Sequence, residues 1–177
     1  MKNLIILGAG TAGTMIANKL AKTLDLSTWR ITVVDRDDEH IYQPGLLFIP
    51  FGDYRPHDVK RPRAVLLPPE VELRLAESED VDPKTQRISL EGGAQLEYDL
   101  LIVATGTRTA PEVTHGLLGP EWYRSIFDFY TLEGAEALGK HLADWEGGRL
   151  VLNVVDMPIK CPVAPLEFLF LADAFFT

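Results

Sequence analysis

The stretch NLIILGAGTAG, residues 3–13, decides the fold. Residues 3–7 form a short, almost wholly apolar run, typical of a parallel strand that is buried on both faces. Residues 11–24 follow as a predicted helix, because their apolar side chains have the spacing of one inward face: Met15, Ile16, Leu20 and Leu24. WRITVVD, residues 29–35, predicts a second strand. These three elements make one βαβ unit of ordinary length.

The turn between the first strand and the helix has the pattern G-x-G-x-x-G. The first glycine allows the tight turn, the second lets the backbone approach a pyrophosphate, and the third lets helix and strand pack closely. Asp35 ends the second strand, where a carboxylate can accept ribose hydroxyls. A glycine pattern alone could be a chance match, but strand, helix, second strand and terminal acid together favour a dinucleotide site. The residues that we expect to bind the cofactor here are Gly8, Gly10, Thr11, Ala12, Gly13, Asp35 and Arg36.

The rest of the chain alternates between strand and helix patterns. Residues 36–69 predict a long connection with at most short helical turns, and KRPRAVLLPPE (60–70), with three basic residues, is expected to be a solvated loop. The other expected elements are a strand over 71–78, a hairpin with a Gly-Gly turn, a buried strand in DLLIVAT (99–105), a helix over 131–143, a strand over 149–155 and a helix over 162–176. The last helix has no stop signal, so the chain is expected to be cut from a longer one.

Composition excludes several classes of protein. The 177 residues are 46% hydrophobic and carry a formal net charge of −9, which argues against a nucleic-acid binder. A single cysteine excludes an internal disulfide, and no Cys/His cluster has zinc-like spacing, so no metal is expected. The first apolar run is too short for a signal peptide, and no run of about 18 apolar residues predicts a membrane span. We therefore expect a cytoplasmic or peripheral membrane protein.

YDLLIVATG, residues 98–106, resembles the strand and turn of two-dinucleotide-binding flavoproteins, in which Ala-Thr-Gly lies beside FAD. The resemblance implies an α/β fold with a Rossmann-like FAD-binding domain over 1–110. Residues 111–177 would be a connection and the first strand and helix of a second Rossmann-like unit. The resemblance adds cofactor contacts at Ala104, Thr105 and Gly106 and places the adenine against the segment at Glu77 and Ser78.

The expected second dinucleotide turn reads NVVDMPIKCPVAPLE, residues 153–167, and has no glycine. Proline also lacks the N–H that a pyrophosphate would need. We therefore predict that no nicotinamide cofactor donates hydride at this position.

The Cys-Pro-x-x-Pro-x-Glu sequence that stands there resembles the sulfide:quinone oxidoreductases and the flavoprotein subunit of flavocytochrome c sulfide dehydrogenases. HIYQPGLLFIPFG (40–52) supports this resemblance, because that family carries a Tyr-x-Pro segment, here Tyr42 and Pro44, near the flavin. The resemblance implies that sulfide is oxidised at Cys161 and that electrons pass through FAD to quinone. It also implies contact with a membrane surface through a C-terminal part of the protein, and it is compatible with a homo-oligomer. The family has two redox cysteines, whereas this chain has one.

Local chemistry agrees with a reactive Cys161. We expect it at or just before a helix N-terminus, with Pro162 in the first turn, where free N–H groups and Lys160 favour a thiolate. Glu167 could relay protons. The alternative for Cys161 is a buried, inert thiol. Two alternatives remain for the whole chain: a type II NADH:quinone oxidoreductase, or an FAD-binding fragment without turnover that needs a partner chain.

Overall fold

The computed structural model describes all residues from Met1 to Thr177. The chain forms two compact units. The N-terminal unit contains Met1–Ile41 and Lys60–Thr107, and the C-terminal unit contains Tyr42–Val59 and Arg108–Thr177. The assignment of 1–110 and 111–177 to two domains stays a prediction.

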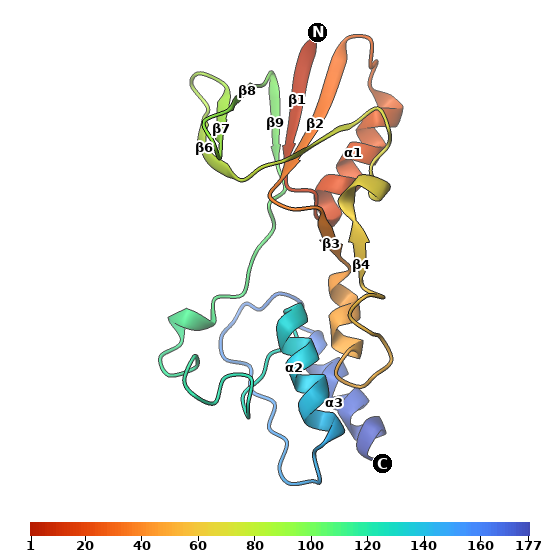
Figure 1. Ribbon diagram of the computed structural model, residues 1–177, viewed down its shortest axis with the longest axis vertical. Helices are drawn as coiled ribbons and strands as arrows, with labels where there is room; N and C mark the ends of the chain where they lie inside the picture. Colours follow the sequence, from red (N-terminus) through yellow and green to blue (C-terminus); the bar gives the residue numbers. More distant parts are fainter. The chain divides into compact units, whose positions relative to one another are not determined.

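A parallel sheet of four strands forms the centre of the N-terminal unit (Figure 1). Its order is β5-β2-β1-β9, and its strands are β1 (Lys2–Leu7), β2 (Trp29–Asp35), β5 (Glu72–Leu75) and β9 (Leu100–Val103). The sequence predicts β1 and β2 correctly. Each has apolar side chains on both faces of the strand, and four consecutive residues of each become buried. Since all four strands are parallel, their carboxyl ends lie at the same edge.

The two faces of this sheet are covered by different elements. Helix α1 (Thr11–Thr23) packs on the face of Leu4 and Ile6. A three-stranded antiparallel sheet packs on the face of Ile5 and Leu7, and its strands are β6 (Ser78–Asp82), β7 (Arg87–Leu90) and β8 (Gln95–Glu97). The Gly-Gly hairpin is thus confirmed, but the strand expected over 71–78 is divided between β5 and β6.

The long connection after β2 contains short elements. Strands β3 (Glu39–Ile41) and β4 (Lys60–Pro62) pair antiparallel, and a 3₁₀ turn η2 (Arg63–Leu66) follows. The pairing returns the chain to the carboxyl edge of the central sheet, so residues 60–63 are not simply a solvated loop.

The C-terminal unit has its own apolar core. Its elements are the 3₁₀ turns η1 (Gln43–Phe48) and η3 (Pro111–Val113) and the helices α2 (Leu132–Ala143) and α3 (Ala164–Phe176). Leu47, Leu138, Leu142, Phe168 and Ala172 are buried together, and aromatic rings such as Phe51 and Phe129 pack on them.

Helix α2 is well defined by sequence, because Thr131 caps it. The Thr131 hydroxyl accepts a hydrogen bond from the Gly134 N–H at 3.0 Å. Asp128 accepts in turn from the Thr131 N–H at 2.8 Å and from the Tyr123 hydroxyl at 2.9 Å. Burial raises the pKa of Tyr123 to about 12, and the neighbouring Asp128 carboxylate adds to that rise.

Three expectations are wrong. Residues 149–155 form no strand, because no other strand lies beside them to complete a ladder of hydrogen bonds. β9 is not a buried strand: it is the outermost strand of its sheet, and Leu100 and Val103 are 46% and 66% exposed. Helix α3 begins at Ala164, so Pro165 and not Pro162 occupies its first turn.

No helix combines the length and the apolar character that a bilayer crossing requires.

Candidate functional site: a dinucleotide loop and a cysteine turn

The glycine-rich turn lies at the carboxyl end of β1 and leads directly into α1. Gly10 is the N-cap residue of α1, no side chain caps this helix end, and no acidic residue lies in its first turn. The first N–H groups of the helix, at Thr11 and Ala12, therefore face outward without a side-chain partner. Such a helix end attracts the negative charge of a phosphate.

The three glycines have three distinct surroundings. A side chain at Gly8, whose φ is +97°, would collide with the backbone of Ala104 and Thr105. A side chain at Gly13 would collide with the carbonyl of Gly8. A Cβ at Gly10 would meet no protein atom within 4 Å. Gly8 and Gly13 are thus required for packing, whereas the space in front of Gly10 is open for a ligand.

Asp35 ends β2 beside this turn and is only 14% exposed. Its Oδ2 accepts a hydrogen bond from the Ala9 N–H at 2.6 Å, and its Oδ1 accepts from the Arg36 N–H at 2.8 Å. The Arg36 side chain is exposed and pairs with Asp37 at 3.3 Å. Asp35 therefore has protein partners at both oxygens, besides any ribose hydroxyl that it could accept.

The second motif meets the first at the same edge of the sheet. The Ala104 N–H donates to the Leu7 carbonyl at 2.7 Å, which extends the pairing of β9 with β1 into the turn. Thr105 and Gly106 are exposed immediately beyond it, and Gly106 has a φ of +70°. The structure thus brings Ala-Thr-Gly against the glycine turn, and the contact of this segment with FAD stays a prediction.

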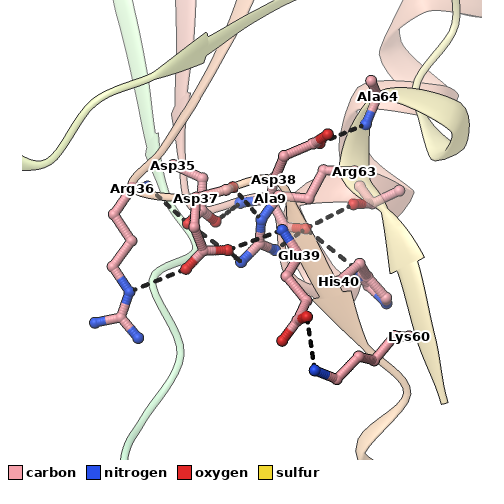
Figure 2. A network of polar contacts seen from close by, with 11 residues as sticks. Ala9, Asp35, Arg36, Asp37, Asp38, Glu39, His40, Lys60, Arg63 and Ala64 are labelled. Carbon is pink, nitrogen blue, oxygen red and sulfur yellow. Dashed lines mark hydrogen bonds and ion pairs between the residues drawn. The ribbon is translucent and has the colours of Figure 1, made fainter. Parts of the chain in front are cut away.

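A polar network that the sequence did not indicate links the connection after β2 to the glycine turn (Figure 2). The Arg63 guanidinium donates from Nη1 to the Ala9 carbonyl at 2.8 Å and from Nη2 to Asp37 Oδ1 at 3.0 Å. It also pairs with Asp35 Oδ1 at 3.3 Å. Burial opposes ionisation of Asp37, but the Glu39 N–H and Arg63 together hold the pKa of Asp37 below its ordinary value. No local pattern could reveal Arg63, because it lies 54 positions from Ala9.

The other predicted cofactor contacts lie elsewhere. Ser78 begins β6, with Glu77 exposed before it, in the N-terminal unit. Tyr42 and Pro44 belong to the C-terminal unit, where Tyr42 precedes η1 and is more than half exposed. Their predicted roles toward a flavin remain predictions.

The cysteine turn lies before α3 in the C-terminal unit. Cys161 is exposed, so a buried inert thiol is not what the structure shows. Its carbonyl accepts hydrogen bonds from the Tyr130 hydroxyl at 3.1 Å and from the Ala164 N–H at 3.2 Å. Lys160 is exposed, and Glu167 is exposed in the first turn of α3. Cys161 precedes the N-cap residue Val163 by two positions, so it does not occupy the helix end itself.

No three His, Cys, Asp or Glu side chains converge so that they could hold a metal ion. The open space at Gly10, the uncapped helix end and the carboxylate at the end of β2 do fit a bound dinucleotide.

The model of the pyridine nucleotide-disulphide oxidoreductase family matches residues 2–151, and the chain belongs to this family. The prediction of a Rossmann-like domain of the FAD-binding flavoprotein type is confirmed. The resemblance is confirmed at the level of this family.

Curated relatives include two kinds of quinone oxidoreductase. The mitochondrial sulfide:quinone oxidoreductase of Mus musculus is 23% identical over 97% of this chain and 38% of its own length. The type II NADH:quinone oxidoreductase of Staphylococcus haemolyticus is 28% identical over 81% of this chain and 34% of its own length. The chain thus spans little more than a third of either relative.

Among solved structures, the sulfide:quinone oxidoreductase of Aquifex aeolicus superposes with a TM-score of 0.66 at 22% identity. The superposition covers 81% of this chain and 32% of the other. At this identity the likeness shows the fold.

Proposed function

We propose that this chain is the FAD-binding part of a flavoprotein that oxidises sulfide and delivers the electrons to a quinone. The observation that carries the proposal is the exposed Cys161 in a turn without glycine, in a chain of this family whose glycine turn at residues 8–13 fits a dinucleotide. The FAD pyrophosphate would lie against Gly10 and the first turn of α1, with its ribose at Asp35.

The proposed oxidation step needs one cysteine and leaves the oxidised sulfur on it as a persulfide. A sulfur–sulfur bond forms between Cys161 Sγ and sulfide, which releases two electrons. When bound, FAD supplies a two-electron acceptor for them. The sulfide proton and one solvent proton accompany the electrons, and a quinone then takes both electrons and protons. Lys160 would favour the thiolate by its charge, and the exposed Glu167 carboxylate would transfer the solvent proton inward.

The nearly complete coverage of this chain by three eukaryotic relatives supports sulfide rather than NADH as the electron donor. The sulfide:quinone oxidoreductases of mouse, Schizosaccharomyces pombe and Dictyostelium discoideum match 96–97% of this chain, and that of Aquifex aeolicus matches 68%. The NADH-quinone enzymes of Saccharomyces cerevisiae and S. haemolyticus match 67% and 81%. A second candidate, a type II NADH:quinone oxidoreductase, is favoured by the 31% identity of the yeast enzyme.

Anaerobic visible spectroscopy of the purified protein separates these candidates. The proposal predicts a yellow protein that bleaches with sulfide, does not bleach with NADH and regains its colour with a soluble quinone. Bleaching by NADH alone would establish the second candidate instead. A yellow protein that neither donor bleaches would be an FAD-binding module, and a protein that does not take up FAD would refute both enzymatic proposals.

A further inference from the structure

The peptide groups on both sides of Ala9 are held by side chains from distant parts of the sequence. Ala9 is fully buried. Its N–H donates to Asp35 Oδ2 at 2.6 Å, and its carbonyl accepts from Arg63 Nη1 at 2.8 Å and from the Thr14 hydroxyl at 3.0 Å. His40 Nδ1 lies 3.3 Å from the same carbonyl. One carbonyl thus faces three side chains from α1, β3 and η2.

The carbonyl of Ala9 and the N–H of Gly10 belong to one planar peptide group. In a trans peptide these two groups point in opposite directions. The partners of the carbonyl therefore fix the direction of the Gly10 N–H, which points away from Arg63. This N–H donates no hydrogen bond within the chain, and the space beside Gly10 is open.

Arg63 has the chemistry to hold this arrangement rigidly. Its guanidinium is 11% exposed and donates in three directions, because Nε also bonds the Asp37 carbonyl at 2.8 Å. The planar fork of an arginine keeps several such bonds in a fixed geometry, which a lysine ammonium cannot reproduce. The same positive charge lies between the carboxylates of Asp35 and Asp37, which would otherwise repel an anionic ligand at the neighbouring loop.

We propose that Arg63 is a positioning residue for the dinucleotide loop: it orients the Ala9–Gly10 peptide so that the Gly10 N–H is preset to donate to the cofactor pyrophosphate. The inference rests on the FAD site of the proposed function and adds a residue outside both sequence motifs. The other interpretation of the network is that Arg63 only ties β4 and η2 to the sheet. That role would affect stability without altering the Gly10 N–H.

Substitution of Arg63 tests the proposal through FAD affinity. The removal of a charge-assisted, buried hydrogen bond predicts FAD binding at least about tenfold weaker in Arg63→Met, and an intermediate loss in Arg63→Lys. Arg30→Met is the matched control, because Arg30 is an exposed arginine at the opposite end of β2. It should bind FAD within about twofold of the wild type.

The Gly10 amide resonance separates positioning from mere stabilisation. In protein labelled with ¹⁵N-glycine, this resonance is identified by its loss in Gly10→Ala, and it should move strongly when FAD binds to the wild type. Arg63→Lys, which keeps the charge and is the variant to use if Arg63→Met does not fold, should show a clearly smaller movement at saturating FAD. FAD affinity within twofold of the wild type and an unchanged Gly10 movement in Arg63→Lys would overturn the proposal. A wild type that binds no FAD would instead refute the cofactor site on which it rests.

Discussion

The two units of this chain build their functional segments in opposite ways. In the N-terminal unit, the dinucleotide loop is built around the buried residue Ala9, whose N–H and carbonyl are paired by Asp35 and Arg63. In the C-terminal unit, the cysteine turn is exposed, and one side-chain hydrogen bond, from Tyr130, supports the Cys161 carbonyl. Packing and hydrogen bonds therefore fix the conformation of the dinucleotide loop, whereas the proposed reactive thiol is distinguished by its exposure to solvent.

The backbone of the cysteine turn sharpens this contrast. Cys161 has a φ of +90°, a conformation that L residues other than glycine adopt at a cost of about 1–3 kcal/mol. Tyr130 and the Ala164 N–H both bond its carbonyl and so hold the turn. Burial raises the pKa of the Tyr130 phenol, with a further rise from Cys161, so the hydroxyl stays a donor further into the alkaline range than an ordinary tyrosine. An exposed thiol on such a turn is open to a small anion such as hydrosulfide.

The largest expected effect tests whether the C-terminal unit has a core of its own. Phe168 is 3% exposed, and its ring stacks on Phe129 with centroids 4.6 Å apart. Phe168→Ala should destabilise the protein by about 3–5 kcal/mol, because it leaves a cavity in this core. Thermal unfolding should show a fall in Tm of about 10 °C.

The control is Phe170→Ala on the same helix, where the side chain is 69% exposed. It should change the free energy of unfolding by less than about 0.5 kcal/mol. Equal losses from both substitutions would show that this core does not stabilise the unit.

Substitutions of two glycines should give the next largest effect, and they separate a role in packing from a role in cofactor binding. Gly13→Ala forces a methyl group onto the Gly8 carbonyl and should destabilise the N-terminal unit by about 2–3 kcal/mol. Gly10→Ala meets no protein atom, so it should change stability by less than about 1 kcal/mol. Because its methyl group occupies the space proposed for the pyrophosphate, it should weaken FAD binding about tenfold or more.

Chemical denaturation and flavin titration of both variants check this pair. If Gly10→Ala bound FAD as tightly as the wild type, the proposal that the pyrophosphate lies against this loop would be wrong. Gly13→Ala that unfolds like the wild type would contradict the close packing of α1 on β1.

A smaller effect should appear at alkaline pH through Tyr123. Its pKa is raised, chiefly by burial, to about 12 in the folded protein, against about 10 for an ordinary tyrosine. A raised folded pKa means that its stabilising contribution is complete below about pH 10 and is lost as the pH rises toward 12. The free energy of unfolding of the wild type should therefore fall more steeply across this range than that of Tyr123→Phe. Parallel curves, measured by urea unfolding at each pH, would show that the phenol does not titrate differently in the two states.

The sequence predicted those parts of the structure that depend on local pattern. β1, β2, α1 and α2 follow from the spacing of their apolar residues. These features need only short-range information.

The predictions from sequence were wrong where contacts between residues far apart in the chain determine the structure. Residues 149–155 have the apolar pattern of a strand, but a strand requires a neighbour to accept its hydrogen bonds, and none is beside it. Arg63 looked like one of several solvated basic residues, yet β3–β4 pairing brings its guanidinium to Ala9. Neither outcome is encoded within a window of ten or twenty residues.

The most direct test of the account compares Cys161→Ser with the wild type in an anaerobic sulfide titration that is followed by flavin absorbance. FAD is proposed to bind in the N-terminal unit and sulfide to react at Cys161 in the C-terminal unit, so Cys161→Ser should bind FAD normally and lose sulfide-dependent bleaching by at least about a hundredfold in rate. Val155→Ala, at an exposed position of the same loop, should bleach like the wild type. A Cys161→Ser protein that retains FAD and bleaches with sulfide at the wild-type rate would contradict the account.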